Sequence, residues 1–211
     1  MKKKFELDAD YQPKEFAFKS EAAVNEIINR YPKGRSQSAM MPLLDLAQRQ
    51  VGEEGAKANP PYGGWIPRAA MDEIARILDL APMRVYEVAT FYSMYNLAPV
   101  GKYLLQMCTT TPCWLCGSAE IVKATEKNLG IHVGESTKDG LFTLMEVECL
   151  GACANAPMIQ VNDDFYEDLT PETMTGLLDN LKKGVVPKPG PQNGRNKAEA
   201  VGGSATLKKA G

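Results

Sequence analysis

The residues of this 211-residue chain whose type and spacing could do chemistry are its five cysteines. Four of them form two close pairs, Cys108-x4-Cys113 and Cys149-x3-Cys153. Thiolates are soft ligands that suit iron–sulfur clusters and zinc. The pattern therefore indicates a metal or cluster site built from two short segments, with these four thiols as candidate ligands.

The residues inside each pair fit such a site. Residues 109–112 (TTTP) and 150–152 (LGA) are small or turn-forming, so that backbone N–H groups can approach the sulfur atoms. Those N–H groups and the threonine hydroxyls would stabilise a negatively charged cluster and help to set its potential.

Spacing alone leaves three other arrangements open. Structural zinc sites favour C-x2-C, which occurs here only at Cys113 and Cys116. A plant-type ferredoxin spacing, Cys108-x4-Cys113-x2-Cys116 followed by a distant cysteine, would leave Cys149 or Cys153 unused. A thioredoxin-like dithiol at Cys113 and Cys116 would not need the second pair at all. We expect Cys116 to be the spare thiol.

Several function classes are disfavoured. His132 is the only histidine, which nearly excludes a histidine-rich zinc site or a Ser–His–Asp triad. Neither G-x-G-x-x-G after a strand nor G-x-x-x-x-G-K-[ST] occurs, so we expect this chain to bind neither NADH nor flavin itself. The formal net charge is −2 without a basic stripe, which argues against nucleic-acid binding. No apolar run is long enough to span a membrane, so we expect no direct membrane insertion.

The N-terminus, MKKKFELD, resembles neither a secretory signal nor a transit peptide. The chain is therefore expected to stay in the compartment in which it is made. Five cysteines without an export signal argue against a disulfide framework.

Helical periodicity runs from about residue 20 to residue 95. Apolar residues recur at Val24, Ile27, Ile28 and Tyr31, and a second amphipathic stretch covers 42–51. The Gly/Pro-rich segment 52–64 is expected to be a loop. Two further helices are expected to start at the prolines Pro67 and Pro82. Together these stretches predict a small helical domain.

A different pattern begins at Gly101. Strands are expected at 103–108, 142–149 and 158–161, with a hairpin over 158–166. Helices are expected at 118–129, capped by Ser118 and ended by Gly130, and again from about residue 170. This order predicts a small α/β layer whose sheet is covered by helices, and the whole chain is therefore of α+β class. From Val185 onward the chain has no apolar period and is expected to be flexible unless a partner orders it.

Three segments carry a resemblance to a known family: 83–92 (MRVYEVATFY), 108–113 (CTTTPC) and 148–157 (ECLGACANAP). They closely resemble the small [2Fe–2S] subunit of respiratory NADH:quinone oxidoreductase, complex I. Segments 44–50, 166–170 and 187–191 are also similar, and the match covers roughly 20–195.

The resemblance implies a helical bundle followed by a thioredoxin-like domain that carries one [2Fe–2S] cluster on Cys108, Cys113, Cys149 and Cys153. The implied organisation is an N-terminal extension at 1–19, the helical domain at 20–99, the ferredoxin domain at 100–184 and a tail at 185–211. Cys116 is a thiol that this four-ligand site does not require.

The same resemblance implies an electron-transfer role beside a flavoprotein subunit that binds FMN and NADH, and next to the large iron–sulfur subunit of the complex. The cluster would lie off the main chain of clusters. The expected location is the cytoplasmic face of a bacterial inner membrane, or alternatively the mitochondrial matrix side. Two alternatives are the equivalent subunit of a soluble NAD-dependent hydrogenase or formate dehydrogenase, and a zinc-stabilised interaction module. A free-standing thiol oxidoreductase is a third.

Overall fold

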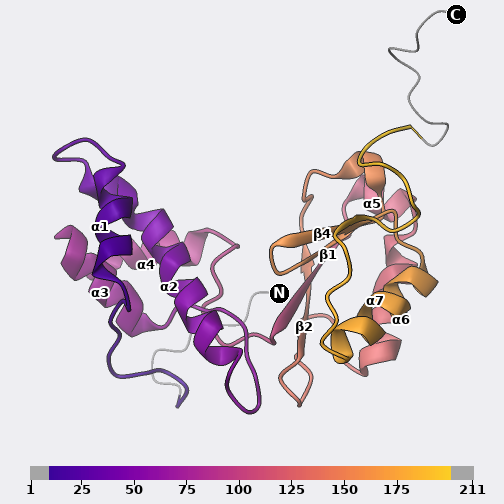
Figure 1. The fold of residues 1–211 in the computed structure, drawn as a ribbon, viewed down its shortest axis with the longest axis horizontal. Coiled ribbons are helices and arrows are strands. Elements are labelled where there is room, and N and C mark those ends of the chain that lie inside the picture. Colours follow the sequence, from indigo (N-terminus) through magenta and orange to yellow (C-terminus); the bar gives the residue numbers. More distant parts are fainter. Residues whose placement is uncertain (1–9, 201–211) are drawn as a thin grey trace, which may run out of the picture. The chain divides into compact units, whose positions relative to one another are not determined.

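The computed structural model describes residues 10–200 (Figure 1). The chain divides into two compact units, which are described separately below. Residues 10–103 and 138–142 form a helical unit, while residues 104–137 and 143–200 form an α/β unit. Together they confirm the α+β class expected from the sequence.

The helical unit contains four α-helices and one 3-10 turn among its described residues. They are α1 (Glu21–Asn29), η1 (Ser36–Ala39), α2 (Met40–Gly55), α3 (Arg68–Leu78) and α4 (Pro82–Phe91). The helix start expected at Pro82 is confirmed, whereas Pro67 is the N-cap residue of α3 and lies just outside the helix. The expected loop 52–64 was partly wrong, because α2 continues through Gly55.

The apolar periodicity seen in the sequence forms the core of this unit. Val24 and Ile27 of α1 are buried, as the i, i+3 spacing predicts. They join buried side chains from the other three helices: Leu43, Leu44, Ala47, Met71, Ile74, Val85 and Ala89. Residues ahead of α1 also pack here, because Phe16 and Phe18 lie against the same core.

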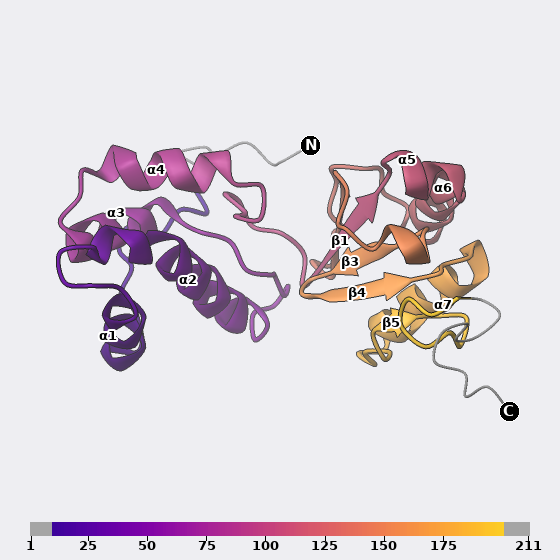
Figure 2. The same ribbon diagram turned by 90° about the horizontal axis from the view of Figure 1, so that it is seen from above.

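The α/β unit is built on a five-stranded sheet with strand order β2-β1-β3-β4-β5. Figure 2 labels β1, β3, β4 and β5 of this sheet, and Figure 1 labels β2. Its strands are β1 (Tyr103–Cys108), β2 (Phe142–Val147), β3 (Ile159–Val161), β4 (Asp164–Glu167) and β5 (Gly190–Pro191). Strand β3 is antiparallel to both β1 and β4, which confirms the expected hairpin. Strand β5 is parallel to β4, with Tyr166 opposite Gly190 and Glu167 opposite Pro191.

Helices α6 (Ser118–Leu129) and α7 (Pro171–Lys182) lie side by side along one side of this sheet (Figure 1). Helix α6 has the bounds that the sequence predicts and ends at Gly130, as expected. Ser118 is not its cap, however. Gly117, with φ +92°, takes that position because glycine adopts the left-handed region without steric cost.

The segment after α7 differs from the sequence expectation of a flexible tail. Between Val185 and Ala200 it contains β5 and hydrogen-bonds to the α/β unit: the backbone N–H of Gln192 donates to Glu167 O at 2.9 Å, and the Tyr166 hydroxyl donates to Pro187 O at 2.9 Å. The edge of the sheet at β4 supplies backbone hydrogen-bond partners for this segment, and the composition of the segment could not predict them. Residues 201–211 lie outside the described residues.

No helix within residues 10–200 is both long and apolar enough to cross a membrane.

Candidate metal centre

The first cysteine pair joins a strand to a short helix. Cys108 is the last residue of β1, and Cys113 lies in α5 (Thr111–Leu115). Thr110 is the N-cap residue of α5, and a proline occupies its first turn, where a missing N–H costs nothing. Both thiols are buried, with 2% and 1% of their residues' surface exposed. The sheet and α5 therefore fix this pair inside the unit.

The second pair lies on the loop after β2. Cys149 follows the strand by two residues, and Cys153 begins the 3-10 turn η2 (Cys153–Asn155). Gly151 lies between them with φ +90°, a conformation that side chains other than glycine rarely adopt. Both cysteines are exposed, and their Sγ atoms lie 3.4 Å apart.

The two pairs converge, as the sequence predicted. Cys108, Cys113 and Met158 form a buried cluster, against which Leu150 and Ala152 of the second loop pack. The backbone N–H of Leu150 also hydrogen-bonds to the Cys108 thiol. The loop of the second pair is thus placed directly on the first pair.

Burial and hydrogen bonds to sulfur shift the pKa values of the individual thiols in different directions. Burial acts to raise the pKa of Cys108, but hydrogen bonds from Thr110, Cys113 and the Leu150 amide outweigh it and hold that pKa below its ordinary value. Burial, assisted by Cys108, raises the pKa of Cys113 to about 12. The pKa of Cys153 is raised, chiefly by its hydrogen bond with Cys149. Because ligation needs thiolates, cluster or metal binding must displace protons here.

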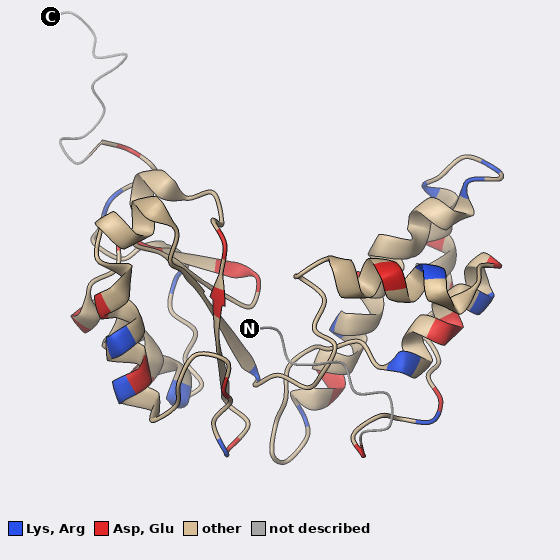
Figure 3. Ribbon diagram, turned by 180° about the vertical axis from the view of Figure 1, so that it is seen from behind, with Lys and Arg blue, Asp and Glu red and all other residues tan. Residues whose placement is uncertain are grey.

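The donors around the sulfurs fit an iron–sulfur cluster. The Thr110 hydroxyl lies 3.4 Å from Cys108 Sγ, and the backbone N–H of Met158 hydrogen-bonds to Cys113. The threonine and Leu150 contacts were expected from the sequence, whereas Met158 was missed. Its N–H reaches the site only because β3 pairs with β1. Helix α5 carries no charged side chain (Figure 3), so what this helix and its flanking residues offer a negative cluster is hydroxyl and backbone dipoles.

Other cysteine and acidic groups stand apart from this arrangement. Cys116 is exposed at the C-terminal end of α5, where it is the C-cap residue. Thr109 donates to a carboxylate oxygen of Glu146 and not to a sulfur atom. Among residues 10–200, no group of three or more histidine, cysteine, aspartate or glutamate side chains is placed so that it could hold a metal ion.

Comparison with known proteins agrees with this geometry. The family model of the thioredoxin-like [2Fe–2S] ferredoxins matches residues 24–182, which is most of the chain.

Curated relatives are similar over most of their own length. A mitochondrial NADH dehydrogenase [ubiquinone] flavoprotein 2 from Dictyostelium discoideum is 50% identical over 94% of this chain and 76% of its own. A subunit of the NADH-quinone oxidoreductase of Rickettsia bellii is 52% identical over 79% of this chain and 93% of its own. The corresponding protein of Rickettsia felis is 56% identical over 73% of this chain and 86% of its own.

Solved structures share the fold. A chain of an NAD+-reducing [NiFe]-hydrogenase in the air-oxidized state superposes with a TM-score of 0.56 at 16% identity, over 69% of this chain. The H2-reduced state gives a TM-score of 0.53 at 17% identity, over 66% of this chain. This chain spans about a quarter of those hydrogenase chains, at 23% and 24% of their length.

Proposed function

The chain belongs to the thioredoxin-like [2Fe–2S] ferredoxin family, and from this premise we propose that it is the small electron-transfer subunit of an NADH:quinone oxidoreductase of the complex I type. The observation that carries the proposal is the convergence of the two cysteine pairs, because Leu150 and Ala152 of the second pair's loop pack against the buried cluster that contains Cys108 and Cys113. Relatives at 50–56% identity, which are subunits of such oxidoreductases, support it.

We propose that Cys108 and Cys113 hold one iron and that Cys149 and Cys153 hold the other. A bound [2Fe–2S] cluster would supply one-electron oxidation and reduction. Around it, the chain's own residues have three tasks. Cys108 and Cys113 anchor the site in the core, while Thr110 and the amides of Leu150 and Met158 direct positive dipoles at the sulfurs. The second pair keeps the site at the surface, where a partner can approach.

The proposed partners follow from what this chain lacks. NADH releases two electrons as a hydride, whereas a [2Fe–2S] site takes one, so a flavin must stand between them. This sequence has no nucleotide-binding glycine motif, and FMN and NADH are therefore assigned to a partner flavoprotein subunit. The large iron–sulfur subunit of the complex is the second proposed partner. The active site and any coupled translocation belong to the assembled complex.

We place the chain in the peripheral part of that complex, on the cytoplasmic face of a bacterial inner membrane. Its relatives include a mitochondrial protein, so the matrix side is the corresponding location in a eukaryote. Immunogold labelling of inside-out and right-side-out membrane vesicles distinguishes the exposed side in either case.

A second candidate is the equivalent subunit of a soluble NAD-dependent hydrogenase or formate dehydrogenase. The observation in its favour is the shared fold with the hydrogenase chains. The two candidates differ in the subunits with which this chain assembles.

The test is capture of the intact complex through an affinity tag on this chain. We expect a flavoprotein and FMN to co-purify, and the complex to reduce quinone with NADH. Treatment with a strong low-potential reductant should give a [2Fe–2S] EPR signal that Cys153→Ser removes and Cys116→Ser retains. Capture of hydrogenase or formate dehydrogenase subunits would favour the second candidate, and a complex without flavin would contradict both.

A further inference from the structure

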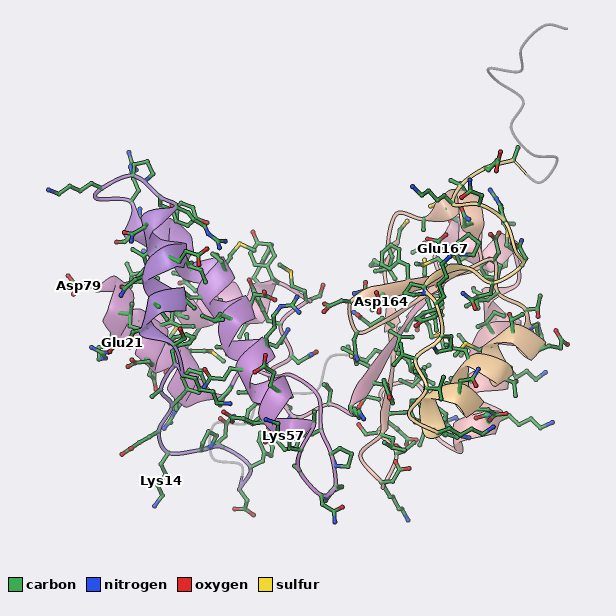
Figure 4. The ribbon with its side chains drawn as sticks, in the orientation of Figure 1. Lys14, Glu21, Lys57, Asp79, Asp164 and Glu167 are labelled. Carbon is green, nitrogen blue, oxygen red and sulfur yellow. The ribbon has the colours of Figure 1, made fainter. Side chains whose placement is uncertain are left out.

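The C-terminal segment returns to the loop that carries the second cysteine pair. Strand β5 pairs with β4, and Gln192 N–H extends this pairing by donating to Glu167 O, the last residue of β4 (labelled in Figure 4). Three residues later, Arg195 reaches the 3-10 turn η2, which begins with Cys153. Residues 41 positions apart in sequence thereby come into contact.

Arg195 makes two contacts of different kinds outside its own segment, while its Nε donates to Glu199 O within that segment. Its Nη1 donates to Asp168 Oδ1 at 3.1 Å, and its Nη2 donates to the backbone carbonyl of Ala154 at 3.0 Å. The Arg195 and Asp168 side chains are only 13% and 10% exposed. A guanidinium can make both contacts at once because its donors are fixed in one plane.

Asp168 connects Arg195 to Asn155, the residue that follows Ala154 in η2. Its backbone N–H donates to Asn155 O at 2.8 Å, and its Oδ2 accepts from Asn155 Nδ2 at 3.0 Å. The same Asn155 amide donates to Lys197 O at 2.8 Å. Asn155 is 2% exposed, so these bonds satisfy a buried polar side chain.

Apart from Leu150 and Ala152, the residues of this loop supply little support of their own. Cys149 and Cys153 are exposed, and a Cβ built on Gly151 would meet no heavy atom of the described residues within 4 Å beyond its chain neighbours. Leu150 and Ala152 hold the middle of the loop on the first pair. Beyond Cys153, the next two residues are held by Arg195, Asp168 and Lys197.

We propose that Arg195, Asp168 and Asn155 form a positioning network that holds Cys153 in place as a cluster ligand. The Arg195 guanidinium hydrogen-bonds to Asp168 and to the Ala154 carbonyl, and it acts on Cys153 through these two residues. The inference rests on the proposed ligand role of Cys149 and Cys153. It assigns to the C-terminal segment a task within this chain, the retention of the cluster.

The test uses the full-length holo chain, purified anaerobically, with Arg195→Gln and the conservative Arg195→Lys. Cluster loss to an iron chelator is followed by visible absorbance, and the reduced proteins are compared by EPR. Loss should be about 10- to 100-fold faster in Arg195→Gln, the range typical of groups that orient metal ligands. Arg195→Lys should be intermediate, because an ammonium lacks the planar fork.

A matched control separates positioning from general stability. Leu178 lies buried in α7 of the same unit and is not a member of the network, so Leu178→Ala should lower the free energy of unfolding while leaving the network's hydrogen-bonding groups in place. The inference predicts slow cluster loss and an unchanged EPR spectrum for this variant, against fast loss and a shifted spectrum for Arg195→Gln.

Two results overturn the inference. One is that Arg195→Gln keeps the wild-type rate of cluster loss and the wild-type EPR spectrum. The other is that Leu178→Ala loses its cluster as fast as Arg195→Gln when the two variants have the same free energy of unfolding. A wild-type chain that contains no iron and sulfide would instead overturn the proposed function, and the inference with it. Measuring the wild type first distinguishes these failures.

Discussion

The Sγ atoms of Cys149 and Cys153 lie 3.4 Å apart on an exposed loop. A disulfide requires about 2.05 Å between the two sulfurs. Two thiolates on one tetrahedral metal, each about 2.3 Å from it, lie about 3.8 Å apart. The pair is therefore close to the spacing at which both sulfurs can ligate the same metal ion.

This spacing predicts which cysteines matter. Cys153→Ser should remove most of the bound iron, because the remaining Cys149 cannot complete one side of the site alone. Cys116→Ser should keep the full iron content, since Cys116 is exposed at the end of α5. Iron content per chain and visible absorbance are the measurements. If Cys153→Ser and Cys116→Ser lost equal amounts of iron, the result would instead favour the plant-type ferredoxin spacing, in which Cys116 is a ligand.

Helix capping gives a second prediction. Thr170 accepts from Thr173 N–H at 3.2 Å and its own N–H donates to Thr173 Oγ1 at 2.8 Å, so Thr170→Ala should lower the free energy of unfolding by about 1 kcal/mol. Ser118→Ala is the matched control. The Ser118 Oγ is buried without a hydrogen-bond partner among the described residues, so its loss should cost nothing or stabilise. Chemical denaturation of both variants measures the contrast, and an equal cost would contradict it.

Two helical glycines should respond oppositely to alanine. In α7, a Cβ on Gly176 would meet no heavy atom of residues 10–200 within 4 Å beyond its own helix, so Gly176→Ala should stabilise by about 0.5–1 kcal/mol. In α2, a Cβ on Gly55 would lie 2.4 Å from the backbone oxygen of Tyr62, so Gly55→Ala should destabilise despite its better helix propensity. The midpoints of unfolding of the two variants test this prediction. A stabilised Gly55→Ala would contradict it, because it would show that the close approach of Gly55 to Tyr62 is not required.

Glu167 predicts a dependence of stability on pH. Burial, and then the nearby Asp168, raise the pKa of Glu167, while Arg195 opposes them. A raised pKa in the folded state means that ionisation costs stability above that pKa, and the cost disappears as pH falls toward 4.5. Glu167→Gln should therefore raise the thermal midpoint at pH 8 by less than about 4 °C.

The advantage of Glu167→Gln should shrink as the pH is lowered from 8 toward 5. Thermal unfolding of the two proteins in parallel at several pH values measures it. An advantage that grew toward acid pH would contradict the assigned direction of the pKa shift.

Local pattern was enough to predict the strand that ends at Cys108 and the helix that follows the first cysteine pair, but not α5, the short helix that holds Cys113. The apolar run ending at Cys108 forms β1, and the periodic stretch from Ser118 to Leu129 forms α6 with the expected bounds. These elements follow from side-chain alternation and helical spacing, which are properties of neighbouring residues. Within the site, small residues inside each pair correctly indicated backbone N–H approach to sulfur, as Leu150 shows.

Contacts between distant segments could not be predicted in this way. Arg195 lies in a stretch without apolar period, and it is ordered by the edge of β4, the buried Asp168 and the Ala154 carbonyl. The Met158 amide reaches Cys113 through the pairing of β3 with β1, a register that sequence spacing does not specify. Ser118 was expected to be a cap because its residue type suits one, yet Gly117 takes the position through its left-handed backbone.

The most direct measurement is the content of iron, zinc and acid-labile sulfide in the anaerobically purified chain, normalised to protein. The account predicts about two irons and two sulfides per chain, held on the four cysteines of the two pairs. About one zinc per chain without sulfide would contradict it, and would make this chain a zinc-stabilised interaction module without an electron-transfer role.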